Sequence, residues 1–218
     1  MSIKRLFQRL FTHNFEDIER LVGAFPLALD EDIRKVAQIL PFKEREIVAG
    51  RGTVKWVDNF ISTIRPQELI VEVVGERLTI PYRVYFNEAD LVLVERLSSV
   101  QRSILHCIYS RHYNGYIRQK HLESLIGISE DFVCPFVIQS LGEYVVEILE
   151  VLDRLLTTPV VDRYASFLSC NRFFWKQTQS RMVSYWDAYY RQDFPELNQY
   201  VGKRISDRLN AAIRRMNS

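Results

Sequence analysis

The chain contains little glycine, proline or cysteine. Its 218 residues include 8 Gly, 7 Pro and 3 Cys. So few turn-forming residues argue against an all-β or loop-rich protein and favour helices. Cys107, Cys134 and Cys170 are odd in number and form no CxxC pair, so the sequence predicts no zinc site. Thiols in apolar surroundings fit a reducing compartment, and we therefore expect a cytoplasmic protein.

Long apolar runs are also missing. Charged residues interrupt every apolar stretch well short of the roughly 20 residues that a membrane-spanning helix needs, so no transmembrane segment is expected. Residues 1–11 are basic and amphipathic, and they predict a first helix docked on the protein, with contact to a membrane surface as the alternative. The apolar face of this segment consists of Ile3, Leu6, Phe7, Leu10 and Phe11.

Familiar catalytic motifs are lacking as well. The sequence contains no HExxH, GxSxG or ExxH, and no Gly-Lys-Ser/Thr follows Gly50-Arg51-Gly52-Thr53, so a zincin, a hydrolase elbow, a di-iron site and a phosphate loop are not indicated. His121-Leu-Glu123 has the HxE spacing of zinc deaminases, but the PCxxC that must accompany it does not occur. We expect no metal, no cofactor and no enzyme activity. The alternative is an enzyme with an unrecognised site near His112 and His121.

Apolar residues recur mostly with helical spacing. The pattern predicts a mainly α-helical protein, either a multi-helix bundle or a short stack of helical hairpins, with one β-hairpin near 68–86. Within the first segment, acids at 30–32 predict a helix start, Pro41 predicts the start of another short helix, and Trp56, Phe60, Ile61 and Ile64 predict one more. We divide the chain into residues 1–65 (helical), 66–87 (hairpin), 88–170 (central helical hairpins) and 171–218 (aromatic and basic helices), packed as one unit.

The hairpin is predicted from β-branched residues over 68–74 and alternation over 77–86. Gly75-Glu76 fits the two-residue turn between the strands, and Pro81 confines its strand to a sheet edge. Two strands alone are marginally stable. We therefore expect the hairpin to pack on helices or to pair with another chain, which makes it a dimerisation candidate.

The central tract 97–156 predicts helices that break at Asn114-Gly115 and at Gly127-Ile128-Ser129. Asn87 is expected to cap a helix before it, Pro135 to open a long helix that continues to Leu155, and Pro159 to close the tract. Residues 116–126 are similar to the second helix of HEAT-type units, in which an Ile/Val-Arg pair precedes a Leu-containing apolar face. This similarity implies stacked helical hairpins that offer one face to partners.

The second break also resembles the centre of a bacterial helix-turn-helix, over Leu-Glu-Ser-Leu-Ile-Gly-Ile-Ser at 122–129 and Val133. The resemblance implies that residues 130–136 enter the major groove of DNA. Glu130 and Asp131 would repel phosphates, and Pro135 falls in the first turns. We therefore expect an ordinary turn between helices.

Two surfaces are candidates for binding. Basic and aromatic residues gather around the first break, and aromatic residues crowd a helix near 172–190, where some should reach an interface. Residues 171–218 carry nine basic and four acidic side chains, so this region either binds a polyanion or packs on the acidic middle of the chain. The predicted partner or ligand contacts are Arg111, His112, Tyr113, Tyr116, Arg118, Lys120, His121, Trp175, Arg181, Trp186 and Tyr190. The predicted nucleic-acid contacts are Lys203, Arg204, Arg208 and Arg215.

These observations favour a non-catalytic protein-interaction or adaptor protein that forms oligomers. Its partner surface would combine residues 111–121 with the aromatic helix 172–190. The alternative is a nucleic-acid-binding protein that uses the basic aromatic C-terminal region.

Overall fold

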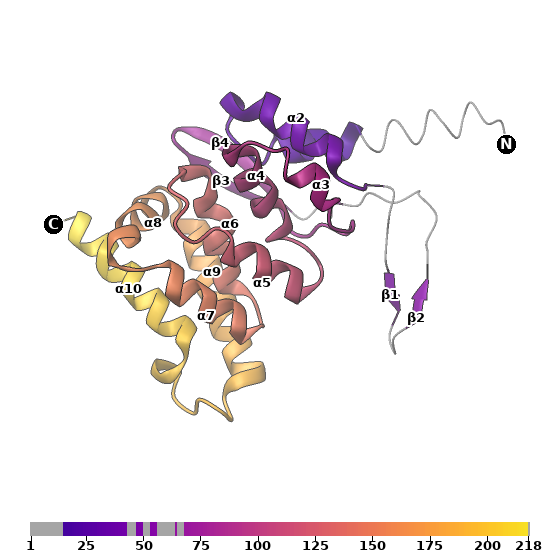
Figure 1. The fold of residues 1–218 in the computed structure, drawn as a ribbon. Coiled ribbons are helices and arrows are strands. Elements are labelled where there is room, and N and C mark those ends of the chain that lie inside the picture. Colours follow the sequence, from indigo (N-terminus) through magenta and orange to yellow (C-terminus); the bar gives the residue numbers. More distant parts are fainter. Residues whose placement is uncertain (1–14, 43–46, 50–52, 56–63, 65–67, 218) are drawn as a thin grey trace.

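The structure is a computed structural model that describes residues 15–42, 47–49, 53–55, 64 and 68–217. It is mainly α-helical, with two-stranded hairpins at the periphery of the helices, which confirms the predicted fold class (Figure 1). Within the described part, no helix is long and apolar enough to cross a membrane. The expected amphipathic helix at 1–11 lies outside the described residues.

The N-terminal part follows the predicted pattern as far as residue 40. Residues 15–22 are helical, and α2 spans Asp30–Ile39 after a short 3-10 turn, η1, at Leu27–Leu29. The three acids at 30–32 occupy the first turn of α2, where the positive end of the helix dipole favours them. Helix α2 buries its apolar stripe of Ile33, Val36 and Ala37.

The prediction of a helix that starts at Pro41 is wrong. Strands β1 (Ile47–Ala49) and β2 (Thr53–Lys55) lie there instead and pair antiparallel, with Val48 opposite Val54. Their β-branched residues prefer extended backbone, and this preference outweighs the proline signal. The further helix predicted over 56–64 lies outside the described residues except for Ile64, which forms an isolated antiparallel bridge with Val84.

The predicted hairpin is present as β3 (Glu68–Val73) and β4 (Glu76–Pro81). Val73 pairs with Glu76, so the turn is Val74-Gly75 and not Gly75-Glu76 as predicted. Both turn residues have positive φ, 49° at Val74 and 80° at Gly75, as a type I′ turn requires. The twist of the strands selects this turn type even though a valine must adopt the left-handed conformation.

Relieving this strain should stabilise the protein. Val74 is exposed and its side chain contributes little to the core, whereas a β-branched residue in the left-handed region is strained by ~1–2 kcal/mol. We expect Val74→Asn to raise the free energy of unfolding by about 1 kcal/mol, measured by urea titration. Ile70→Asn, at an exposed strand position, is the control and should destabilise instead. An equal effect of the two substitutions would contradict the turn assignment.

One residue on each outer edge of this hairpin bonds to another part of the chain. On β3, the backbone N–H of Glu72 donates to Asn171 Oδ1 (2.7 Å), and Asn171 Nδ2 donates to the Glu72 carbonyl (2.8 Å). On β4, the N–H of Thr79 donates to the carbonyl of Gly23 (2.8 Å). Asn171 therefore takes the place of a neighbouring strand, and a partner strand would find these positions already bonded.

The central helices follow the two predicted breaks. Helix α4 (Ser99–Tyr109) begins with a capping box formed by Ser98 and Gln101, and α5 (Gly115–Glu123) is capped by Asn114. The second break has Gly127 at a positive φ of 84°. The helix predicted from Asn87 starts later, as the short α3 (Leu91–Val94), because Asp90 and not Asn87 accepts the capping N–H.

The prediction of one long helix from Pro135 to Leu155 is also wrong. The tract contains η2 (Asp131–Val133), α6 (Cys134–Gln139), η3 (Ser140–Gly142) and α7 (Val146–Leu155) as separate elements. The break is at Glu143, which is extended (φ −100°, ψ 157°) and buried. Pro159 does not close the tract but lies in the first turn of α8 (Thr158–Cys170). Proline is tolerated there because the N–H groups of the first turn make no hydrogen bond within the helix.

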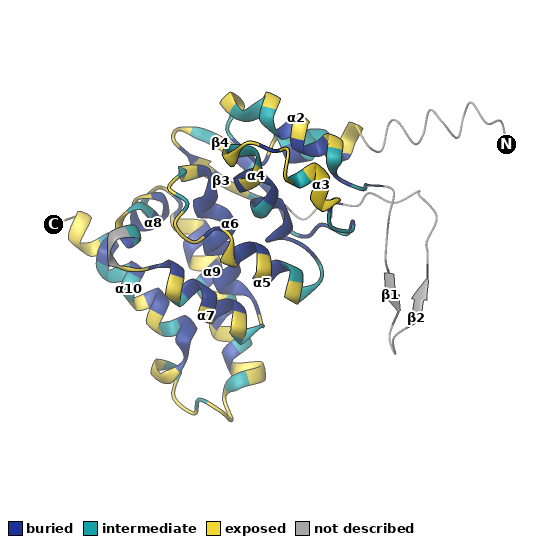
Figure 2. Ribbon diagram, in the orientation of Figure 1, coloured by how far each residue is buried: buried dark blue, intermediate teal, exposed yellow. Residues whose placement is uncertain are grey.

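The C-terminal region consists of α9 (Arg172–Tyr185), a π-helical turn η4 (Trp186–Tyr190), η5 (Leu197–Gln199) and α10 (Val201–Met216). Helix α10 packs mainly on α8 and α7. One hydrophobic core contains residues from along the chain, from Leu21 to Ala212. Figure 2 shows the buried residues in dark blue on most of the helices. The β3–β4 hairpin packs into this core through Val71, Leu78 and Ile80.

Candidate functional site

Three buried arginines converge on one buried glutamate. Glu143 receives Arg83 Nη2 at 2.6 Å on Oε2 and Arg111 Nη2 at 3.3 Å on Oε1, and Arg118 Nη2 lies 3.5 Å from Oε2. The four side chains are almost completely inaccessible to solvent. We call these four residues the arginine cluster.

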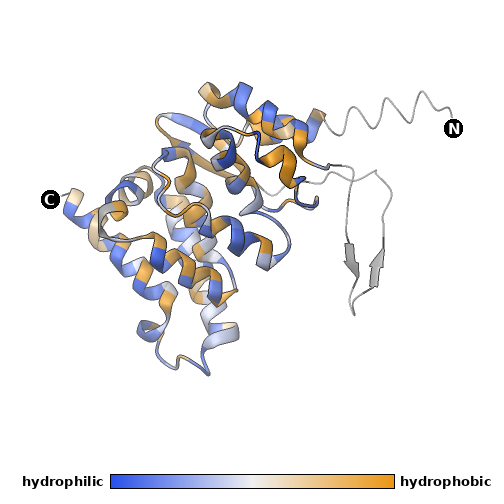
Figure 3. Ribbon diagram, in the orientation of Figure 1, coloured by the Kyte–Doolittle hydropathy of each residue, from blue (hydrophilic) through white to orange (hydrophobic). Residues whose placement is uncertain are grey.

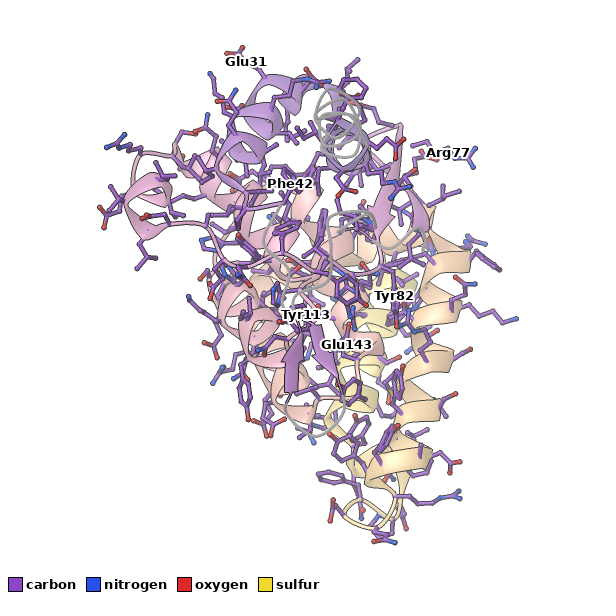
Figure 4. All side chains as sticks on the ribbon, turned by 90° about the vertical axis from the view of Figure 1, so that its right-hand side faces the viewer. Glu31, Phe42, Arg77, Tyr82, Tyr113 and Glu143 are labelled. Atoms are coloured by element: carbon purple, nitrogen blue, oxygen red, sulfur yellow. The ribbon has the colours of Figure 1, made fainter. Side chains whose placement is uncertain are left out.

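Short loops bring the arginine cluster together. Arg83 follows β4, Arg111 follows α4, and the two segments are joined because Val84 N–H donates to the Arg111 carbonyl and Tyr113 N–H donates to the Val84 carbonyl. Arg118 Nη1 closes the site by donating to the carbonyls of His112 and Tyr113. In Figure 4 the labelled Tyr82, Tyr113 and Glu143 lie in the same part of the molecule.

The arginine cluster contains more positive than negative charge. Burial raises the pKa of Glu143, but the guanidiniums of Arg111, Arg83 and Arg118 outweigh this effect and lower it below its ordinary value. Burial lowers the pKa of Arg111 well below the usual arginine value. Arg111 Nε and Nη1 are buried without a hydrogen-bond partner, and neither is open to solvent. We therefore regard the arginine cluster as a structural element without room for a ligand.

His112 has a structural role too. Its Nε2 lies 2.9 Å from the carbonyl of Phe86, and its Nδ1 accepts the backbone N–H of Asn114 at 3.0 Å. Nε2 must therefore carry the proton. Both ring nitrogens are bonded to backbone groups, so His112 has none left for acid–base chemistry.

His106 and His121 form a second polar group with Glu88. The two Nδ1 atoms lie 2.8 Å apart, and His121 Nε2 lies 2.8 Å from Glu88 Oε1, which also receives Lys120 Nζ at 2.8 Å. A carboxylate only accepts, so Nε2 of neutral His121 carries its proton, and His106 Nδ1 donates to His121 Nδ1. Glu88 is on the opposite side of the His121 ring from His106. Within the described residues, no three His, Cys, Asp or Glu side chains could hold a metal ion.

His106 and His112 should make the protein less stable in mild acid. Burial, with a smaller contribution from His121, lowers the pKa of His106 to about 4, and burial lowers the pKa of His112 to about 4. An unfolded histidine takes up a proton near pH 6.5. Between pH 6.5 and about 4 the unfolded state therefore binds more protons, so the free energy of unfolding should fall as the pH falls.

Urea titrations at several pH values would measure this loss of stability. Native-state NMR should show the Cε1 protons of His106 and His112 without a titration step until the pH approaches 4. A titration step near pH 6.5 for both rings would contradict the prediction.

The structure distributes the predicted residues of the 111–121 turn between core and surface. Arg111, His112, Arg118 and His121 are buried. Tyr113 stacks on Tyr85 with the ring centroids 5.6 Å apart. Lys120 is exposed but paired with Glu88, and the exposed Tyr116 is the member of the group that projects from the surface.

The predicted basic contacts of α10 face acids of the same chain. Arg208 Nη2 lies 2.7 Å from Asp153 Oδ1, and Arg204 lies 3.8 Å from Asp153 Oδ2. Arg215 pairs with Asp162 at 3.0 Å, and Lys203 pairs with Asp207. Arg204, Arg208 and Arg215 of α10 therefore pair with Asp153 and Asp162 from the acidic middle of the chain.

Most of the predicted aromatic residues pack internally. Trp175 and Trp186 are buried, and their Nε1 atoms donate to Asn210 Oδ1 and to the Phe194 carbonyl, both at 2.9 Å. Tyr190 donates its hydroxyl to the Tyr144 carbonyl at 2.6 Å. The contact of Tyr190 joins the π-helical turn η4 to the residues at the start of α7, where the backbone N–H of Val146 also donates to the Tyr190 hydroxyl.

A groove lies between α9 and the open end of the β3–β4 hairpin. It encloses about 640 Å³, and Leu69 and Tyr82 of the hairpin form one side of it. The other side belongs to α9 and contains Phe173, Lys176, Arg181 and Tyr185. We call this surface the α9 groove.

The α9 groove is aromatic and positively charged. Phe173 is 75% exposed, although a phenylalanine is usually buried. The described residues that line the groove include no acid, and residues 171–186 contain no Asp or Glu. Arg181 packs over the Tyr82 ring at 5.2 Å and donates to the Tyr82 hydroxyl at 3.2 Å. Among the described residues, neither Lys176 nor Arg181 forms a salt bridge, in contrast to the arginines of α10.

Sequence reasoning identified Arg181 but did not select several residues that shape the two sites. Arg83 and Glu143 were missed because a lone arginine in a loop and a glutamate within a predicted helix carry no distinctive pattern. Tyr82 and Leu69 were missed because they come from the hairpin, about 100 residues before α9. The absence of acids from 171–186 was the signal that could have located the groove.

Comparison with known proteins adds no assignment to this site. The chain matches no protein-family model, no curated protein and no solved structure among those compared.

Proposed function

We propose that this protein is a non-catalytic interaction module, of the adaptor type, that binds a protein segment in the α9 groove. The free thiols of buried Cys107 and Cys134 are consistent with work in the reducing cytoplasm. The histidines support no catalytic role, since His112 is fully engaged by backbone groups and His121 by Glu88 and His106.

The observation that carries the proposal is the composition of the α9 groove. Large aromatic side chains and arginine are typical of the residues that dominate protein interfaces. Phe173 and Tyr185 offer apolar surface, and Lys176 and Arg181 offer charge that the chain does not neutralise. The groove has a volume of about 640 Å³, which is large enough for several side chains of a partner.

Binding of single-stranded nucleic acid is the second candidate. Aromatic faces beside unpaired cations are the elements that bind bases and phosphates without sequence preference. The α9 groove has both elements, whereas the cations of α10 are paired with Asp153 and Asp162. The nucleic-acid hypothesis therefore concerns α9 more than α10.

A photo-crosslinking amino acid at position 177 would separate these candidates. Gln177 is exposed and lines the groove, so it tolerates replacement and lies next to any bound segment. We expect a protein adduct that survives nuclease treatment, together with no such adduct when the cross-linker replaces Tyr116 on α5. A nuclease-sensitive adduct would favour the second candidate, and identical adducts at both positions would reject the groove as the binding site.

A further inference from the structure

We infer that the segment bound in the α9 groove is helix α3 of a second copy of this chain. The inference rests on the proposed function, because it requires the groove to bind protein. It names both the partner and the surface of the partner that enters the groove.

Helix α3 presents apolar side chains that the fold leaves exposed. Leu91, Val92 and Leu93 are 72%, 58% and 37% exposed. Figure 3 shows this short helix as hydrophobic, and Figure 2 shows it as largely exposed. Three consecutive aliphatic residues are thus left partly or largely exposed, and clustered apolar side chains on a surface are candidates for an interaction site. We call these three residues the α3 knob.

The charges around the α3 knob complement those of the groove. Asp90 and Glu95 flank the knob and are exposed, and Glu88 lies just before them. Glu88 is paired with Lys120 and His121 of the same chain and exposed Arg96 follows Glu95, so Asp90 and Glu95 are the acids that border the knob, whereas Lys176 and Arg181 are the charged residues among the described lining of the α9 groove. An apolar knob with an acidic rim therefore matches an aromatic groove with a basic rim, which favours correct docking over other orientations.

One copy cannot join its own two surfaces. Figure 1 places α3 beside α2 at the margin of the molecule, well separated from α9. Pairing between copies is therefore head to tail, with different surfaces on the two molecules. Such contacts close into a ring or continue as an open chain, according to the rotation between neighbours.

The first test is sedimentation velocity of the full chain over a concentration series. The knob and the groove form a small interface, so we expect weak association that becomes visible at protein concentrations on the order of 100 μM. Added salt should weaken it, because the charged rims contribute. A protein that stays monomeric at about 1 mM would overturn the inference.

Two single variants then test the pairing itself. Leu91→Ser removes the centre of the knob, and Phe173→Ser removes the exposed ring of the groove; each should remain monomeric. Leu27→Ser is the matched control, since Leu27 is 76% exposed and belongs to neither surface. It should associate like the wild type. Circular dichroism and thermal melting check that all three variants are folded.

Mixing the two variants provides the decisive measurement. Each variant keeps one intact surface, so the Leu91→Ser and Phe173→Ser proteins should form a 1:1 dimer that cannot grow further. If the mixture stays monomeric, or if both single variants still associate, the head-to-tail pairing is wrong. A monomeric protein that still gives a nuclease-resistant adduct at position 177 with a different protein would refute the inference and leave the proposed function standing. A protein that neither associates with itself nor gives a nuclease-resistant protein adduct at position 177 would refute both the inference and the proposed function.

Discussion

Replacing Glu143 with glutamine should destabilise the protein by about 3–5 kcal/mol, the usual cost of leaving buried charges without their partner. Three guanidiniums, from Arg83, Arg111 and Arg118, would then face one another without a carboxylate. Chemical denaturation of Glu143→Gln and the wild type would measure the difference in unfolding free energy.

Arg111→Met is the informative companion. It removes one of three buried cations and leaves the 2.6 Å pair of Arg83 and Glu143 in place. It also loses the hydrogen bond from Arg111 Nη2 to the Tyr82 carbonyl, which is worth about 1.5–3 kcal/mol for a charged donor. Because the substitution also relieves repulsion among the arginines, we expect it to cost clearly less than Glu143→Gln. An equal or larger cost would show that Arg111 and not Glu143 holds the cluster together.

Acid should remove the contribution of Glu143. The pKa of this carboxyl is lower in the folded than in the unfolded protein, so its contribution is complete above the unfolded pKa near 4.5 and is lost as the pH falls through the folded value. The difference between the wild type and Glu143→Gln should therefore shrink below about pH 4.5. This pH range lies below most of the range, from pH 6.5 to about 4, over which His106 and His112 lower the stability.

Asn171→Ala should be the second severe substitution. The Asn171 side chain makes three hydrogen bonds, two with the backbone of Glu72 and one with the Phe167 carbonyl. The two bonds with Glu72 are only partly buried and contribute about 0.5–1 kcal/mol each, and leaving the buried Phe167 carbonyl unpaired costs about 1–2 kcal/mol, so we expect a total loss of about 2–4 kcal/mol. Hydrogen exchange of the Glu72 amide should also accelerate well beyond the change in global stability.

Asn210→Ala is the matched control for this experiment. Asn210 is partly buried and accepts one hydrogen bond from Trp175 Nε1, so its removal should cost about 1 kcal/mol. A similar loss for both substitutions, with unchanged exchange at Glu72, would show that Asn171 does not seal the strand edge.

Local chemistry explains which parts of the fold could be predicted from the sequence. The break at Asn114-Gly115, the break at Gly127 and the acidic start of α2 depend on residues within one helical turn, and each was predicted correctly. The break at Glu143 depends on arginines 25 to 60 residues earlier in the chain. No periodicity within residues 135–155 contains that information, so the pattern suggested one long helix.

The candidate site shows the same division. Aromatic and basic residues over 172–190 indicated a binding region, and Phe173, Arg181 and Tyr185 do line the α9 groove. The sequence could not show that Trp175 and Trp186 turn inward or that Tyr82 completes the groove, because these depend on packing between α9, α10 and the hairpin. Nor could it show that Asp153 pairs with the arginines of α10.

The Asn171 contact also sets an order of events when the chain is made. Asn171 follows Glu72 by 99 residues, so a ribosome working at ~5–20 residues per second needs about 5–20 s more before the side chain that seals β3 exists. During this interval the hairpin has an open strand edge, which is a template for pairing with other nascent chains. Chaperone demand and aggregation should therefore depend on how quickly residues 73–171 are translated, and slow codons placed there should lower the yield of folded protein without changing any contact in the final structure.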